Sequence, residues 1–263
     1  MLKFFIIFIS TLLVPYLFVL ATPTTHIWAP STDIQPYGKT HLTADTYIPV
    51  KSKDHNDNKL YVQQVYGLTF SLLSDKPQDN LLGKLFPYLD QVMAETGFDY
   101  KKGLGHALDK WPVYFNFKCA VPEGAYFKYM PAFAMGAYDM GYKHNYTNNN
   151  LWYFKTAKTL SMGKLNLGRL SAGYFNGNGR TLRDKNGERD NSGPMFAWER
   201  VMSEINERLW ICVDYQGTQS SYGAMNYGFS WKFTNNVSTI VGYEIYNNPN
   251  LKNTVTVQLD VDF

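Results

Sequence analysis

The chain has 263 residues and a formal net charge of +3, with 45% hydrophobic, 16% aromatic and 18% charged residues. So small a charge beside so many apolar residues argues against a disordered chain and against a nucleic-acid binder. The mean hydropathy of −0.30 excludes a bundle of membrane helices, because each would need about 20 consecutive apolar residues. The length is compatible with a single large all-β domain.

The N-terminus has the pattern of an export signal. Lys3 precedes an apolar run from Phe4 to Leu20, which ends at Ala21. Residues 1–21 are therefore predicted to be a secretory signal peptide, with an uncleaved anchor helix as the alternative. Residues 22–38 contain Pro23, Pro30 and Pro36 and are expected to form a non-helical, periplasmic lead-in, which either hangs free or enters the following domain.

From residue 39 onward, apolar and polar residues alternate with period two in segments of about ten residues, separated by turn residues. The last segment is the clearest, since Val257, Leu259, Val261 and Phe263 share one face. The pattern predicts an all-β fold, a single antiparallel transmembrane β-barrel over 39–263. The twelve expected strands lie near 39–49, 60–73, 92–101, 111–120, 125–140, 150–160, 165–176, 194–203, 208–216, 222–233, 237–246 and 253–263.

Connection lengths support this count. If the first strand starts in the periplasm, the outer connections 50–59, 102–110, 141–149 and 177–193 are polar or long, and most inner ones are short. Residues 74–91 break the rule, because they fall on the inner side yet include several leucines. They are predicted to form a short amphipathic helix that is interrupted at Pro87 and lies at the membrane interface. The alternatives are that these residues plug the lumen or that they mark a miscounted strand.

Alternation alone does not distinguish a membrane barrel from a soluble ligand-binding barrel, because each has one apolar face. Three features favour lipid: a polar face with charges of both signs, tryptophan and tyrosine toward strand ends on the apolar face, and the terminal Phe263. An aromatic C-terminus after an alternating strand is typical of substrates of the bacterial barrel-assembly machinery. The expected location is therefore the bacterial outer membrane, with outer-membrane lipid and that machinery as partners, no nucleic-acid partner, and a monomeric state.

Several segments resemble a group of uncharacterised, porin-like outer-membrane β-barrel proteins of Gram-negative bacteria. The resemblance covers most of the chain after the signal segment, and its segments are His26–Pro36, His41–Tyr47, Gly97–Lys101, Ala172–Tyr174, Leu209–Trp210, Asp214–Thr218 and Tyr243–Asn248. It implies an outer-membrane barrel. It implies no catalytic residue, because no established activity belongs to the group, and residues 74–91 look like a departure from a shorter turn.

The alternation also predicts which charged side chains face inward. The hypothesised pore-lining residues are Asp45, Glu95, Asp99, Lys118, Lys128, Lys155, Arg169, Glu199, Asp214, Lys232, Glu244 and Asp260. They predict a narrow passive channel for small polar solutes or ions. The alternative is a lumen filled by ion pairs, in a non-conducting barrel used for structure or interaction.

Catalytic and metal-binding patterns are weak. His41, Thr43 and Asp45 share one predicted face, but the rise per strand residue puts His41 and Asp45 about 13 Å apart, too far for a hydrogen bond. A rim hydrolase is therefore the least favoured function, and the chain is not expected to be an enzyme. The loop 184–190 lacks the calcium-loop pattern, so no metal or cofactor is expected. Cys119 and Cys212 are predicted to face opposite sides and to stay unbonded.

Overall fold

The computed structural model describes residues 25–50, 61–74, 76–105, 108–163 and 165–263. The predicted signal peptide, residues 1–21, lies outside this part of the chain. The described residues form twelve strands: β1 (Thr40–Pro49), β2 (Gln63–Ser71), β3 (Met93–Lys102), β4 (Val113–Val121), β5 (Ala132–Gly141), β6 (Asn148–Met162), β7 (Leu165–Asn176), β8 (Ser192–Val201), β9 (Leu209–Gln216), β10 (Ala224–Lys232), β11 (Val237–Tyr246) and β12 (Thr254–Asp262).

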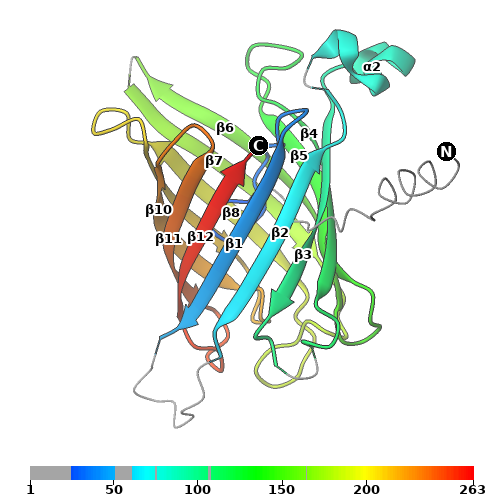
Figure 1. The fold of residues 1–263 in the computed structure, drawn as a ribbon, viewed down its shortest axis with the longest axis vertical. Coiled ribbons are helices and arrows are strands. Elements are labelled where there is room, and N and C mark those ends of the chain that lie inside the picture. Colours follow the sequence, from blue (N-terminus) through cyan, green and yellow to red (C-terminus); the bar gives the residue numbers. More distant parts are fainter. Residues whose placement is uncertain (1–24, 51–60, 75, 106–107, 164) are drawn as a thin grey trace, which may run out of the picture.

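Each strand pairs antiparallel with its neighbours in sequence, and β1 pairs with β12 to close the barrel (Figure 1). In that closing pair Thr43 lies opposite Asp260 and Thr46 opposite Val257. The chain enters β1 and leaves β12 at one end, here called the terminal end; the opposite end, where β1 runs out at Pro49, is called the loop end. Closure matters because an unpaired strand edge in hydrocarbon would leave backbone groups without hydrogen-bond partners.

The barrel and its strand number confirm the prediction, and most strand boundaries agree within three residues. The fifth strand differs, since it begins at Ala132 rather than near residue 125. Residues 122–131 instead close a turn of their own, in which the Gly124 amide donates to the Met130 carbonyl at 3.0 Å. Gly124 adopts φ of +77°, which a residue with a side chain rarely accepts within a strand.

The segment between β2 and β3 contains the expected short helix. It comprises a 3₁₀ turn at Pro77–Asp79, the helix α2 at Leu81–Leu85 and a second 3₁₀ turn at Pro87–Leu89. The Asn80 side chain caps α2 by accepting hydrogen bonds from the amides of Leu82 and Gly83. The three pieces project from the terminal end (Figure 1), outside the lumen. Among the described residues, no helix has the length and apolar character needed to cross a membrane.

The outer face of the barrel is apolar and the inner face largely polar. Phe154, Met135 and Phe229 are 63%, 63% and 45% exposed on the outside, whereas Lys118 and Glu244 are fully buried inside. The tyrosines and tryptophans expected on the apolar face, such as Tyr66 and Trp152, point outward. This arrangement is the inverse of a soluble barrel, whose apolar residues fill the interior.

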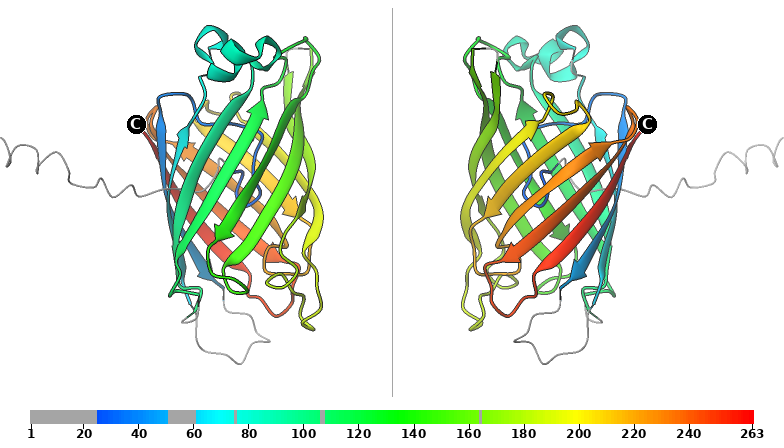
Figure 2. Two further views of the ribbon diagram at one scale, coloured as in Figure 1. Left: turned by 90° about the vertical axis from the view of Figure 1, so that its right-hand side faces the viewer. Right: turned by 90° about the vertical axis from the view of Figure 1, so that its left-hand side faces the viewer.

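Residues 25–36 run inside the barrel (Figure 2). Of the two locations left open for the lead-in, the described part therefore occupies the lumen. A short hairpin begins it, with a bridge between Thr25 and Pro30 and a hydrogen bond of 2.9 Å from the His26 amide to the Ala29 carbonyl. We call residues 25–36 the internal segment.

Candidate functional site

Most of the predicted pore-lining residues do face the lumen. Those almost completely buried there are Asp45, Glu95, Asp99, Lys118, Lys155, Asp214 and Glu244. Arg169, Glu199 and Asp260 also point inward, with side chains 18%, 14% and 18% exposed. Lys232 is exposed where β10 ends, at the terminal end.

Lys128 is the exception, because it is exposed in the turn 122–131 and does not line the lumen. Its ammonium nitrogen lies over the Tyr129 ring, 5.6 Å from the ring centroid. In the lumen, by comparison, the Lys101 nitrogen lies 5.1 Å from the centroid of the Tyr114 ring. The prediction was wrong because the period-two pattern was extended through residues that form a hydrogen-bonded turn rather than a strand.

Two wall carboxylates hold the backbone of the internal segment. Asp214 on β9 accepts hydrogen bonds from the amides of Ile27, at 2.8 Å, and Trp28, at 3.0 Å. Glu95 on β3 accepts from the Gln35 amide at 2.7 Å. Buried amides without partners are costly, so these carboxylates substitute for the water that the segment loses inside the barrel.

Wall side chains also donate to carbonyls of the segment. Lys155 donates to the Pro30 carbonyl at 2.9 Å, and the Gln258 amide donates to the Ile27 carbonyl at 2.8 Å. Because Lys155 lies on β6 and Gln258 on β12, the segment bridges different sides of the lumen.

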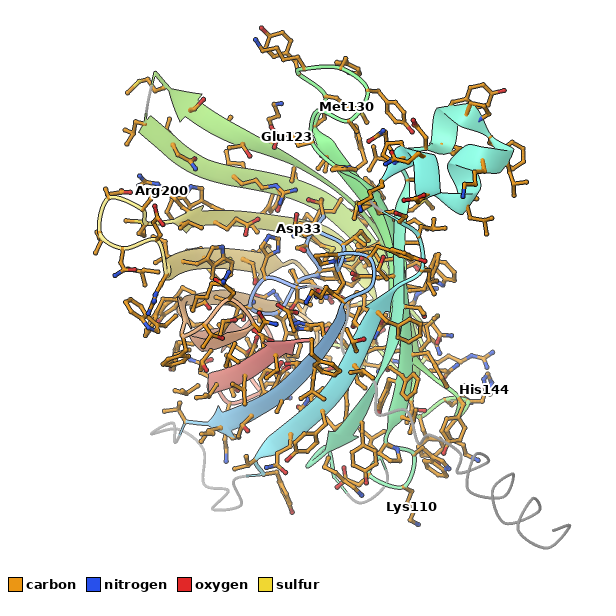
Figure 3. The ribbon with its side chains drawn as sticks, turned by 45° about the horizontal axis from the view of Figure 1, so that its top comes forward. Asp33, Lys110, Glu123, Met130, His144 and Arg200 are labelled. Atoms are coloured by element: carbon orange, nitrogen blue, oxygen red, sulfur yellow. The ribbon has the colours of Figure 1, made fainter. Side chains whose placement is uncertain are left out.

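An ionic group connects the segment to the terminal half of the barrel. Arg169 contacts Asp33 at 2.6 Å and Glu199 at 3.7 Å, and His26 lies 3.4 Å from Glu199. Seen from the terminal end, Asp33 lies inside the ring of strands (Figure 3). The Trp210 ring nitrogen donates to Glu199 at 3.0 Å, so this carboxylate is held from two sides.

Two apolar clusters complete the packing. Ile27 contacts Cys212 and Ile240 on the inner wall. Ala29 belongs to a second cluster, whose other buried members are Tyr138, Leu151, Tyr153, Phe175, Leu182 and Met195. Cys119 faces outward and Cys212 inward, and both are free, as expected.

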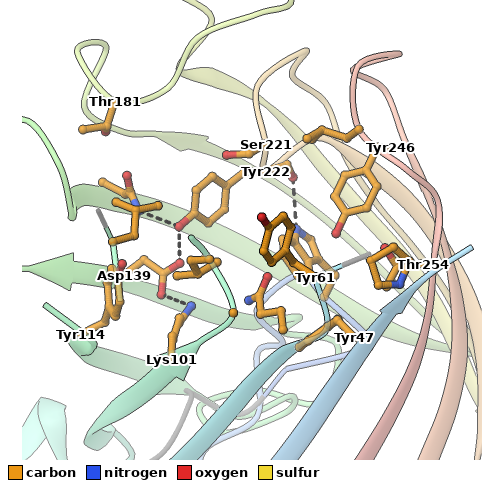
Figure 4. A pocket seen from close by; sticks show the side chains of 18 of the residues that line it. Tyr47, Tyr61, Lys101, Tyr114, Asp139, Thr181, Ser221, Tyr222, Tyr246 and Thr254 are labelled. Atoms are coloured by element: carbon orange, nitrogen blue, oxygen red, sulfur yellow. Dashed lines mark hydrogen bonds and ion pairs between the residues drawn. The ribbon is translucent and has the colours of Figure 1, made fainter. Parts of the chain in front are cut away.

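Between the internal segment and the loop end of the barrel lies a cavity of about 660 Å³, whose lining is drawn in Figure 4. We call it the vestibule. Trp28, at the tip of the segment, lines it together with Tyr47 from β1 and Tyr246 from β11. The Trp28 ring meets Tyr47 and Tyr246 edge to face, with centroids 5.7 and 6.3 Å apart.

A polar chain of four residues crosses the vestibule wall. Lys101 pairs with Asp139 at 2.5 Å, the Tyr222 hydroxyl donates to Asp139, and Asn149 donates to that hydroxyl at 2.8 Å. Burial, then the nearby Asp139 carboxylate, raises the pKa of the Tyr222 phenol well above its ordinary value. The phenol therefore keeps its proton and remains a donor.

The backbone at Asp139 is unusual. The residue sits at the irregularity between Tyr138 and Met140 in the β5–β6 pairing and adopts φ of +52°. A non-glycine residue in this region is strained and persists only where its surroundings hold it. Here the contacts with Lys101 and Tyr222 hold it and direct the carboxylate into the vestibule.

The weak hydrolase pattern is not assembled. His41 contacts Asp262 at 2.9 Å and Asp260 at 3.3 Å, across the β1–β12 pair, while Thr43 donates to Asp45. In the described part of the chain, no group of three or more histidine, cysteine or acidic residues is arranged to hold a metal ion.

No protein-family model matches the sequence, and no curated protein matches it significantly. The chain is similar in fold to solved outer-membrane porins and channels. A KdgM porin shares 7% identity at a TM-score of 0.48, covering 85% of this chain and 98% of its own. An outer membrane channel of Pseudomonas putida F1 shares 10% at 0.46, covering 90% and 100%, and OmpF of Salmonella typhi shares 8% at 0.38, covering 86% and 96%. The likeness concerns the barrel fold alone.

Proposed function

We propose that the chain is an outer-membrane β-barrel that acts as a narrow passive channel for small polar solutes or ions, with the internal segment as its constriction. The apolar outer face supports the membrane location. Phe154 and Phe229 would be exposed to water in a soluble protein, and burying such rings in lipid is favourable. In this proposal the loop end faces outward and the terminal end faces the periplasm.

The channel proposal rests on what obstructs the lumen. It is made by residues 25–36, which enter the barrel, together with wall side chains that meet beside them, such as Tyr138 on β5, whose hydroxyl donates to Gln216 on β9 at 3.0 Å. A twelve-stranded barrel encloses more space than small filled barrels do, and here the chain's own N-terminal region occupies that space. Displacing the segment would leave a lumen lined by Asp214, Glu95, Lys155 and other charged groups.

The attachments of the segment are mostly polar. Ile27, Trp28 and Gln35 are held through backbone hydrogen bonds to wall carboxylates, which water can replace when the segment moves. When the segment is displaced, its hydrogen bonds to the wall are therefore replaced by hydrogen bonds to water. A segment held only by apolar contacts would instead expose apolar surface to water, which is unfavourable.

Planar-bilayer recording tests the proposal. The full chain is compared with a variant that lacks residues 22–36, each first shown to be folded by its heat-dependent gel migration. We expect rare or small steps from the full chain and frequent, larger steps from the deletion. A folded deletion variant that gives no steps would overturn the channel.

The non-conducting barrel is the second candidate. It is favoured by the complete burial of Ile27, Ala29 and the Glu95–Lys118 pair, which leaves little room for water at those levels. In that case the deletion would lower the stability of the barrel without creating conductance.

A further inference from the structure

The vestibule combines exposed aromatic rings with hydrogen-bonding groups. Tyr61 and Tyr146 on its rim are 58% and 49% exposed. Tyr222 and Trp28 lie deeper, with ring centroids 6.2 Å apart. In Figure 4 the rings of Tyr61, Tyr222 and Tyr246 border the same space.

Most polar groups of the vestibule are neutral. Besides Lys101, two further cations line it: Arg180, which is exposed and contacts His144 and Asn145, and Lys252, which also has an interaction partner. The charge of Lys101 is matched by Asp139 at 2.5 Å, so the deep wall presents a compensated pair. Gln63, Asn250 and Thr254 add amide and hydroxyl groups to the lining. Such groups both donate and accept, which suits a ligand that carries many hydroxyls.

The size of the space limits the ligand. A cavity of about 660 Å³ lies within the usual range for small-molecule sites. It is too small for a folded partner. An apolar ligand would displace water from Asn149, Gln63 and the Lys101–Asp139 pair and would offer these groups no hydrogen bonds in return.

We propose that the vestibule binds a short, uncharged oligosaccharide. One face of a pyranose ring presents C–H groups, which pack against the electron-rich face of an aromatic ring, while its edge presents hydroxyls. Tyr61 and Tyr222 supply ring surface, and the amide of Gln63 is placed to bond the hydroxyl edge.

The same site contacts the internal segment. Trp28 lines the vestibule, and its ring nitrogen donates to the Tyr222 carbonyl at 3.1 Å. A bound saccharide therefore rests on the tip of the segment. The inference goes beyond the proposed channel and does not depend on conduction, because the site is present in the closed barrel.

Isothermal titration of the full, folded chain tests the proposal, in a detergent without a sugar headgroup. The probes are maltotriose, cellotriose and xylotriose, with citrate and tetraethylene glycol as non-saccharide comparisons. We expect saturable binding of at least one trisaccharide. Removing one stacking ring by Tyr61→Ala is expected to weaken that binding about tenfold.

Tyr142→Ala is the matched control, because Tyr142 is 62% exposed in the β5–β6 connection and does not line the vestibule. Unchanged affinity in this variant, with weakened binding in Tyr61→Ala, supports the site. Binding of none of the three trisaccharides, equal affinity of wild type and Tyr61→Ala, or tighter binding of citrate overturns it. Failure of this test would leave the conductance of the deletion variant unaffected, so the two proposals fail separately.

Discussion

The carboxylate of Asp214 accepts a hydrogen bond of 2.8 Å from the backbone amide of Ile27, across 187 residues of sequence. The same oxygen accepts from Trp28, and the other oxygen accepts from Asn226 at 2.6 Å. One wall residue thus holds the tip of the internal segment, and its own orientation is fixed by the next strand.

Asp214→Ala is expected to loosen the segment. The change leaves the amides of Ile27 and Trp28 without partners, at a cost of about 1–3 kcal/mol for each buried group that stays unsatisfied. The displaced state should become roughly tenfold or more populated, since 1.4 kcal/mol corresponds to a factor of ten. Open probability in planar bilayers measures the effect.

Asp260→Asn provides the control for Asp214→Ala. It removes a lumen carboxylate that pairs with His41 on β1, so the charge of the lumen changes by the same amount. Equal open probabilities in the two variants would show that charge, rather than release of the segment, governs conduction.

A disulfide between residues 27 and 212 is expected to lock the segment in place. Ile27 packs against the free Cys212, so Ile27→Cys brings two thiols together, and Cys119→Ser removes the remaining cysteine. The oxidised protein should show conductance steps no more frequent than those of the wild type. It should not show the frequent, larger steps expected of the variant that lacks residues 22–36. Adding Cys212→Ser should abolish the redox dependence; a persistent dependence would contradict the locking.

The strand pattern and the closure of the barrel could be predicted because lipid and lumen impose opposite polarity on alternate residues. Leu259 and Gln258 on β12 show this directly. The inner apolar cluster could not be predicted in the same way. On β6, Leu151 and Tyr153 face inward while Trp152 and Phe154 face outward, so both faces are apolar and alternation carries no information.

The site was also only partly predictable. Asp214 and Glu95 were expected in the lumen, but their bonds to residues 27 and 35 join segments far apart in sequence. No local pattern encodes such contacts. The position of Asp139 depends on an irregular pairing between β5 and β6, which shifts the alternation by one residue.

The Glu95–Lys118 pair is expected to be the most sensitive ion pair in the lumen. Both side chains are fully buried, with 2.9 Å between nitrogen and oxygen. Lys118→Met leaves a buried carboxylate without its cation and should destabilise the barrel by about 3–5 kcal/mol. The double variant Glu95→Gln, Lys118→Met should recover most of the loss in urea unfolding; an equal loss in both would contradict this.

The turn 122–131 is expected to respond to acid. Burial disfavours the Glu123 anion, but hydrogen bonds from Lys158 and Thr159 outweigh it and lower the pKa of this carboxyl. A lowered pKa means that the stabilisation is present above the ordinary carboxyl range and is lost as the pH falls through the folded-state value.

Hydrogen exchange at the Thr159 amide measures this, because that amide donates to Glu123 at 3.0 Å. After correction for the intrinsic pH dependence, protection should fall in acid. Glu123→Gln should flatten the profile, and a flat profile in the wild type would refute the assignment.

Phe229→Lys tests which face of the barrel meets lipid. Phe229 points outward from β10, between Ile211 and Val241 on the adjacent strands. A lysine near the middle of the bilayer is expected to cost about 2–4 kcal/mol in folding into lipid vesicles, while Phe229→Leu, which stays apolar, should cost much less. If both variants fold into vesicles with equal free energy, this face does not contact hydrocarbon. Only in an environment without water does an ammonium group cost so much more free energy than a methyl group.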